Sequence, residues 1–275
     1  MLKLEGGYFS KGFSYWVWLL MAFQAGYVNV GGFFESGNFV SHVTGTSSQI
    51  GMGIAQLDPV MLSTFIVVLL AFIIGAGFAG YQIGFKQEVG QEPRYVLVLA
   101  VKSLFFGLIL LLSEVDLIES SKDAINKAHL LLIFFLSFCC GVQNATCSLA
   151  TGGFLKPTHM TGLSTDIGLM FTKILAWDRK SDRYKTEMRK SWTRVSILAS
   201  FIFGGAVAAS IFSYNGHYGF LFPFLSSLCF LMVGMIQGNE SEYSHSWAFK
   251  AAKSSIVVTF VVTLVFGINA CVSLV

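Results

Sequence analysis

The sequence predicts an all-α polytopic membrane protein with about seven spanning helices, two short broken or re-entrant helices and two internal repeats. The 275-residue chain is 54% hydrophobic and only 12% charged, which is about half the charged fraction of a soluble domain. No Lys or Arg lies between Lys11 and Lys86, and residues 196–239 and 254–275 contain no Asp, Glu, Lys or Arg. About 20 apolar residues are enough to cross a bilayer, so these stretches predict repeated crossings.

Hydropathy places the spanning helices between hydrophilic breaks, at 13–34, 60–84, 95–113, 129–150, 194–213, 218–237 and 255–275. Two further segments, 42–57 and 159–176, are apolar but contain many Ser, Thr and Gly residues. They are short for a spanning helix and too apolar for loops. We therefore expect two half-helices, which are either re-entrant or complete a broken span.

Basic residues gather in one hydrophilic segment, the loop predicted at 177–194. The seven are Arg179, Lys180, Arg183, Lys185, Arg189, Lys190 and Arg194. Cytoplasmic loops of membrane proteins are enriched in Lys and Arg, so we expect this loop to lie in the cytoplasm. Three acidic residues in the same segment dilute its charge, which argues against a nucleic-acid site.

The two halves of the chain share a series of motifs in the same order. The matching segments are Gly26–Asn29 with Gly141–Asn144, His42–Gly45 with His159–Gly162, and Phe72–Gly75 with Phe201–Gly204. We predict one membrane domain made of repeat 1 (13–113), repeat 2 (129–237) and an extra C-terminal helix (255–275). The copies are parallel if each short helix spans the membrane and inverted if it is re-entrant. Acidic residues in 114–123 slightly favour inverted copies.

Glycine-rich stretches at 29–41 and 144–158 predict irregular backbone at membrane depth, which is tolerated where protein buries it or a water-filled cavity borders it. Each stretch precedes a helix start rich in hydroxyl groups, and a helix N-terminus attracts anions. Secondary transporters commonly place such broken helices around a site between repeats. Close helix packing by small residues is the alternative interpretation. The predicted solute-binding residues are Asn29, His42, Thr44, Gly45, Gln49, Gln143, Asn144, His159, Thr161, Gly162 and Thr165.

Asp166 is the candidate coupling residue. It lies in the second short segment, where the first copy has Gln49, and an acid inside a membrane typically marks a proton pathway or a buried pair. Lys102 is a candidate partner for it, although a lysine can also extend its charged end to the interface. His42 and His159 are further candidate proton carriers, because histidine changes charge near neutral pH.

Catalytic signatures are absent from the sequence. It contains no Gly-x-Ser-Gly or Gly-x-Gly-Asp protease motif and no His-Glu-x-x-His motif, and its five Cys lack zinc-ligand spacing. The glycines at 75, 77 and 80 lie within an apolar segment, so they indicate packing and not nucleotide binding. We expect neither an enzyme nor a bound metal or cofactor. The expected partners are the lipid bilayer and a small-molecule solute, with no nucleic acid, and a homo-oligomer stays open.

The function that fits best is a secondary transporter or permease for a small polar solute. The two helix N-termini favour an anionic group on it, and Asp166 offers coupling to protons. A passive channel would use the same polar breaks without a coupling acid. A structural or partner-binding membrane protein is the third alternative, in which the small residues serve packing alone.

The motifs resemble the YoaK-like family of bacterial multi-pass membrane proteins, which has no assigned function. The resemblance rests on the runs Phe39–Gly45, Gly141–Ala145 and Thr158–Gly168, and it extends over roughly 13–275. It implies a bacterial inner-membrane location and a transport role without a settled substrate. The family often has Asp where this chain has Asn29, which would leave more of any acidic role to Asp166.

Overall fold

The structure, a computed structural model, describes residues 13–115 and 127–238, and these residues form helices without a strand. The helices are α1 (Phe13–Ser36), α2 (Val43–Gln56), α3 (Pro59–Ala79), α4 (Lys86–Glu88), α5 (Tyr95–Glu114), α6 (Lys127–Ala150), α7 (Met160–Ala176), α8 (Asp182–Asn215) and α9 (Leu221–Gly238). A π-helical segment, Gly80–Phe85, joins α3 to α4, and a 3-10 turn, Gly216–Phe220, joins α8 to α9.

Five helical stretches among the described residues are long and apolar enough to cross a membrane. They are Tyr15–Ser36, Pro59–Glu88, Tyr95–Glu114, His129–Ala150 and Asp182–Met235. The last has 54 residues and includes both α8 and α9. The chain is therefore a helical protein with the features of a membrane protein. The helix predicted at 255–275 lies outside the described residues.

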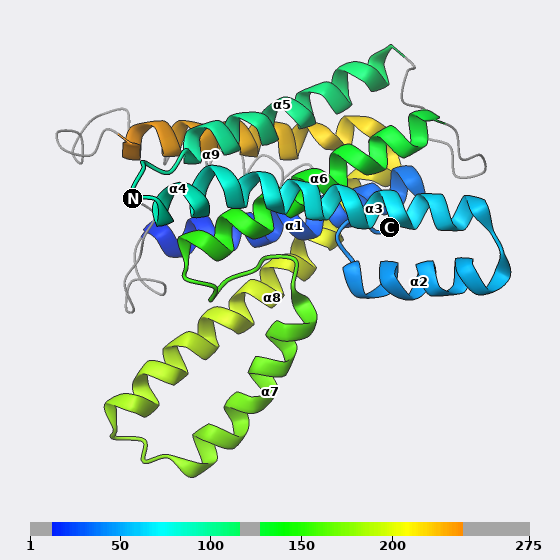
Figure 1. The fold of residues 1–275 in the computed structure, drawn as a ribbon. Helices are drawn as coiled ribbons and strands as arrows, with labels where there is room; N and C mark the ends of the chain where they lie inside the picture. Colours follow the sequence, from blue (N-terminus) through cyan, green and yellow to red (C-terminus); the bar gives the residue numbers. More distant parts are fainter. Residues whose placement is uncertain (1–12, 116–126, 239–275) are drawn as a thin grey trace.

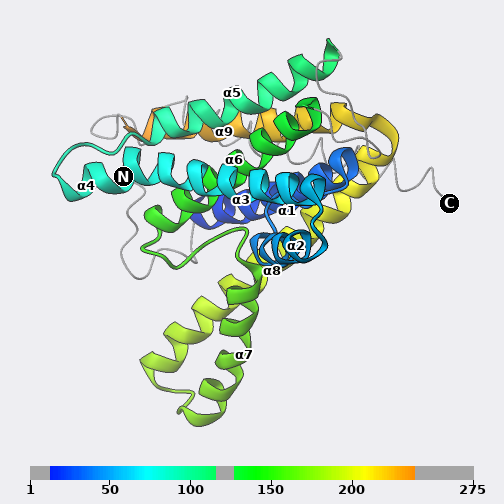
Figure 2. The same cartoon turned by 45° about the vertical axis from the view of Figure 1, so that its right-hand side comes forward.

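Helices α1 and α6 form the centre of the bundle. About 78% of the apolar stretch in α1 and 67% of that in α6 is buried, against 22% of the α3–α4 stretch. Figures 1 and 2 show α5 and α9 on one side of this central pair and the two short helices, α2 and α7, on the other. Helix α2 packs against α3, and α7 packs against the first half of α8, with which it projects from the bundle.

The direction of the central helices follows from their contacts. Met21 of α1 accepts a hydrogen bond from Gln143 of α6, whereas Gly32, eleven residues further along α1, lies beside Leu136, seven residues earlier in α6. Helices α1 and α6 therefore run antiparallel. Helices α5 and α9 also run antiparallel, because Gly107 lies beside Phe224 and Gly234 lies beside Leu99.

Glycines allow two helix pairs to approach until their backbones touch. Between α1 and α8, a Cβ atom at Gly26 would overlap the carbonyl oxygen of Phe201, and a Cβ atom at Gly204 would overlap that of Phe23. Small residues at helix interfaces permit this approach, which is a common form of packing in membranes. Between α3 and α6 the same arrangement joins Gly75 to Phe138 and Gly141 to Phe72.

Local capping sets two helix starts. Asp58 accepts hydrogen bonds from the backbone N–H groups of Val60 and Met61 at the start of α3, where Pro59 occupies the first position. Ser181 accepts one from the N–H of Tyr184 at the start of α8. Side-chain oxygens at this position satisfy N–H groups that the helix itself leaves free, and proline at the first position costs no hydrogen bond.

Two predicted boundaries are wrong. The segment 177–194, predicted as a loop, is helical from Asp182 onward, because hydropathy detects its charge but not its capped helical start. The irregular backbone predicted at 29–41 and 144–158 begins later, since α1 continues to Ser36 and α6 to Ala150. The glycines at which the chain leaves these helices, Gly37, Gly152 and Gly153, have φ angles of 68°, 60° and 84°, which glycine adopts at little cost.

Candidate functional site

A cavity of about 410 Å³ lies where α2 and α7 begin. It is lined by residues from α1 and α6, from the two segments before the short helices, from the first turn of each short helix, and from α3 and α8. These residues are Asn29, Ser41, His42, Val43, Thr44, Phe72, Asn144, Thr158, His159, Met160, Thr161 and Phe201. Volumes of this size are typical of sites for small molecules.

The lining is made of pairs. Each of the residues from the first half of the chain has a partner at the matching position of the second half, as Asn29 has Asn144 and Phe72 has Phe201. Six of the predicted solute-binding residues line the cavity, three from each half: Asn29, His42, Thr44, Asn144, His159 and Thr161.

Asn29 and Asn144 hold the returning chain beside the helix that it has just left. The Oδ1 atom of Asn29 accepts hydrogen bonds from the N–H and the hydroxyl of Ser41, at 3.0 and 2.8 Å. In the second half, Oδ1 of Asn144 accepts from the N–H of Thr158, at 3.2 Å. Since an asparagine amide has one oxygen and one NH₂ group, this leaves both Nδ2 groups for other acceptors, and no described residue accepts from either.

Both short helices begin at a histidine that does not cap them. His42 precedes α2 and His159 precedes α7, and neither side chain bonds to the helix end. Each imidazole instead lies over the first turn of its helix, where a Cβ atom at Gly45 or Gly162 would overlap the ring. Gly45 and Gly162 therefore make room for the imidazoles beside the cavity and do not line it.

The first turns of α2 and α7 offer free hydrogen-bond donors. No described residue accepts a hydrogen bond from the backbone N–H of Thr44, Gly45, Thr161 or Gly162. Such N–H groups carry the positive end of the helix dipole and are a common binding site for anions. Together with the two asparagine NH₂ groups and the two threonine hydroxyls, the N–H groups of Thr44 and Thr161 make the cavity rich in donors.

The other predicted residues do not line the cavity. Thr165 uses its hydroxyl within α7, where it donates to the carbonyl of Thr161 at 3.0 Å, and Gln49 lies further along α2. Asp166 forms an ion pair with Arg194 of α8, with 3.3 Å between Oδ2 and Nε, and its side chain is 52% exposed. Lys102 is therefore not the partner of Asp166, because α5 lies on the opposite side of the central helices from α7.

Lys102 instead occupies a buried polar cluster that the sequence did not predict. Its ammonium group donates hydrogen bonds to the side-chain oxygens of Gln24 in α1 and Gln143 in α6. The NH₂ group of Gln143 donates to the carbonyl of Met21, and that of Gln24 donates to α9, chiefly to Ser226 at 2.7 Å. Four helices thus meet at Lys102, and Gln143 belongs to this cluster and not to the cavity.

A signal for this cluster exists in the sequence. Gln24 and Lys102 are polar residues within predicted spans, and polar residues in spans generally face one another across helix interfaces. Which residues pair depends on how the helices are rotated, and hydropathy does not report that rotation. Among the described residues, no three His, Cys, Asp or Glu side chains lie close enough together to hold a metal ion.

Comparison with known proteins identifies a family but no function. Residues 17–235 match the model of a family described as "Protein of unknown function (DUF1275)". No curated protein and no solved structure matches the chain. The family match agrees with the resemblance to an uncharacterised membrane-protein family in the sequence.

Proposed function

The chain belongs to the DUF1275 family of proteins of unknown function, and from its cavity we propose that it is a secondary transporter or permease for a small polar solute with an anionic group. The observation that carries the proposal is the paired set of free donors at the starts of α2 and α7. The threonine hydroxyls and backbone N–H groups of both helices border one volume of about 410 Å³. A solute bound there would contact both halves of the chain at once.

We propose further that residues 13–113 and 129–237 are inverted copies of one unit. The matched glycine contacts support this. Gly26 contacts Phe201, and the residues at the corresponding positions of the other copies, Gly141 and Phe72, contact each other in the same way. The antiparallel directions of α1 and α6, the first helices of the two copies, support an inverted and not a parallel relation. Inverted repeats are a frequent basis for alternating access in transporters, with the site at the repeat interface.

The proposed location is the bacterial inner membrane, with the basic residues of 177–194 on the cytoplasmic side. The distribution of Lys and Arg supports this orientation. Lys86 and Arg94 lie in the connection from α3 to α5, which Figure 1 places at the same end of the bundle as the start of α1. Glu114 lies at the opposite end, where α5 finishes.

Asp166 is the proposed proton-responsive element, and it would act through helix packing. Its carboxylate joins α7 to Arg194, whose guanidinium also bonds to Glu187 within α8, at 3.3 Å. Protonation of Asp166 would remove one of these two attractions and loosen α7 from α8. Because Asp166 is half exposed, the ion pair contributes at most about 1 kcal/mol, which suits a switch better than a structural bond.

Loss of the paired hydroxyls should slow solute flux. We expect the double variant Thr44→Val/Thr161→Val to fold normally and to lose roughly tenfold in flux, because each change removes one hydrogen bond to the solute. Uptake of nitrate, formate, lactate and phosphate into proteoliposomes is the measurement. Thr165→Val is the matched control, since that hydroxyl bonds within α7. Equal flux in all three proteins would contradict the site, and flux without saturation or exchange would indicate a channel.

Neutralising Asp166 should make solute flux independent of the pH gradient. Asp166→Asn keeps the shape of the side chain but cannot change charge, so we expect solute flux to persist while its stimulation by an imposed pH gradient disappears. The control is Asp182→Asn, which removes an acid whose ion pair, to Lys185, lies within α8, and it should retain the stimulation. The same pH-stimulated flux in wild type and Asp166→Asn would remove the coupling role.

A further inference from the structure

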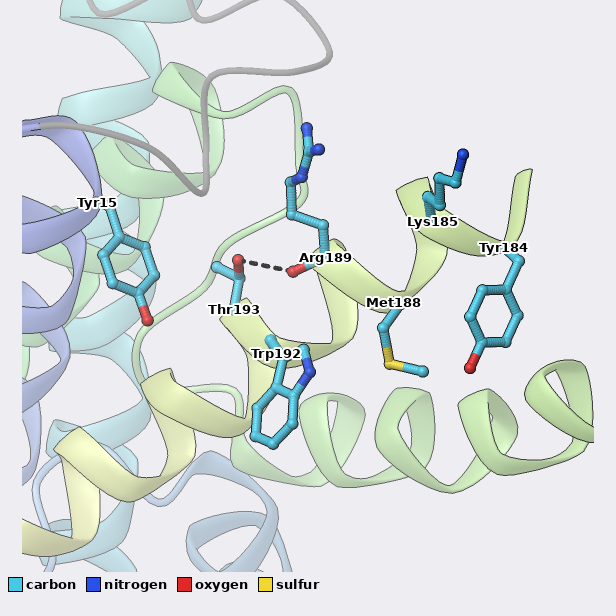
Figure 3. A pocket seen from close by; sticks show the side chains of 7 residues that line it. All are labelled: Tyr15, Tyr184, Lys185, Met188, Arg189, Trp192 and Thr193. Atoms are coloured by element: carbon cyan, nitrogen blue, oxygen red, sulfur yellow. Dashed lines mark hydrogen bonds between the residues drawn. The ribbon is translucent and has the colours of Figure 1, made fainter. Parts of the chain in front are cut away.

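A second concavity, of about 490 Å³, lies where the first half of α8 meets the start of α1 (Figure 3). Tyr15 contributes from α1, and its hydroxyl donates to Ser196 of α8 at 2.8 Å. The rest of the lining comes from α8, in two rows with four-residue spacing. Lys185 and Arg189 lead the first row, and Tyr184, Met188 and Trp192 form the second. Residues four apart lie on one face of a helix, so a basic row runs beside an aromatic row.

Neighbouring acidic residues neutralise the basic row only weakly. In Figure 3 the side chains of Lys185 and Arg189 extend to the same side of α8. Lys185 lies 3.5 Å from Asp182, but both side chains are largely exposed, at 62% and 100%, and such a pair is weak. Among the described residues, none forms an ion pair with Arg189. The donors of the aromatic row are also free, because no described residue accepts from the indole N–H of Trp192 or the hydroxyl of Tyr184.

The ends of the apolar stretches place the concavity at the level expected for lipid headgroups. Tyr15 is the first residue of the apolar stretch in α1, and Thr193 is followed after Arg194 by a stretch without Asp, Glu, Lys or Arg that continues to residue 239. Trp16 and Trp192 are 67% and 65% exposed. Exposed tryptophans at the end of apolar helices are typical of the interface between hydrocarbon and water.

We propose that this concavity, independently of any transport function, binds the headgroup of an anionic phospholipid. Arg189 and Lys185 would pair with the phosphodiester, since both side chains favour phosphate oxygens. The indole N–H of Trp192 would donate to a headgroup or ester oxygen, while its ring and that of Tyr184 would lie along the glycerol and upper acyl chains. Basic pockets beside membrane helices commonly bind anionic headgroups in this way. A lipid held there would contact both α1 and α8.

Native mass spectrometry of the purified full-length protein tests this site. The protein is incubated with equimolar phosphatidylglycerol and phosphatidylcholine, and the ratio of the two bound lipids is measured. We expect wild type to retain phosphatidylglycerol preferentially. In Lys185→Gln/Arg189→Gln, the ratio of bound phosphatidylglycerol to bound phosphatidylcholine should fall about tenfold. Both residues are exposed, so the variant should fold, and circular dichroism verifies this.

The double variant Arg179→Gln/Lys180→Gln is the control. It removes the same charge from exposed residues near the start of α8 that do not line the concavity, and it should keep the preference. The proposal is overturned if wild type binds both lipids equally, or if the two double variants lose the preference equally. Displacement of phosphatidylglycerol by an excess of inorganic phosphate would also overturn it, because the site would then bind a free phosphate and not a lipid.

Discussion

Gly75→Ala is expected to prevent α3 from packing on α6 and to leave little folded protein. A Cβ atom at this position would overlap the carbonyl oxygen of Phe138. The obstacle is helix backbone and not a side chain that can rotate, so the helices must separate along their contact. Overpacking of this kind costs about 1–3 kcal/mol or more. We expect a lower apparent melting temperature in detergent and a loss of the monodisperse peak in size-exclusion chromatography.

Gly77→Ala, two residues further along the same helix, provides the control. No atom of another helix lies within 4 Å of a Cβ atom built at Gly77. Alanine is the better helix former by up to about 1 kcal/mol, so this variant should be at least as stable as wild type. Equal destabilisation by both changes would mean that α3 tolerates no alanine for reasons other than its contact with α6.

Lys102→Met is expected to have the second large effect. The change keeps the length of the side chain but removes the ammonium group on which the buried oxygens of Gln24 and Gln143 depend. An unsatisfied buried acceptor costs about 1–3 kcal/mol, and both would be left in the interior. We expect a large loss of thermal stability, because Lys102 also connects α5 to the two central helices.

Ser103→Ala is the matched control for Lys102. Ser103 is buried on the same helix, but its hydroxyl donates only to the carbonyl of Leu99, one turn earlier. Its loss should cost less than about 1 kcal/mol, since that carbonyl is also an acceptor of the helix itself. If Lys102→Met were as stable as Ser103→Ala, Lys102 would not be the residue that joins the helices.

The residues around the cavity were predictable because the sequence contains the motif twice. His42–Gly45 and His159–Gly162 marked the starts of two short helices, and the structure places helices at Val43–Gln56 and Met160–Ala176. The role of the glycines was not predictable. Their function, to leave space for the preceding imidazole, depends on a side-chain rotation that sequence does not report.

Errors in the prediction have a common physical origin. The glycine-rich stretch 29–41 suggested a break in α1, yet the helix continues through Gly31 and Gly32. Gly31 lies in close contact with Phe212, and Gly32 lies in close contact with Val40. The basic residues before Arg194 suggested a loop, yet a charged segment is helical when it is capped and packs against α7. In both cases the tertiary neighbour decided the local structure. Lys102 was wrongly predicted as the partner of Asp166 for the same reason, because Arg194 lies close to Asp166 only once α7 packs against α8.

The reactivity of single cysteines at Thr44 and Thr161 tests the central claim most directly. Cys139, Cys140, Cys147 and Cys229 are buried, and all native cysteines would be replaced by alanine. Each variant, in membrane vesicles, is treated with an anionic sulfonatoethyl or a cationic trimethylammonioethyl methanethiosulfonate. Ser137→Cys, at a fully buried position, is the control. If both short helices begin at one water-filled, donor-rich cavity, both cysteines react, and faster with the anionic reagent. Reaction as slow as at Ser137→Cys, or faster with the cationic reagent, would contradict it.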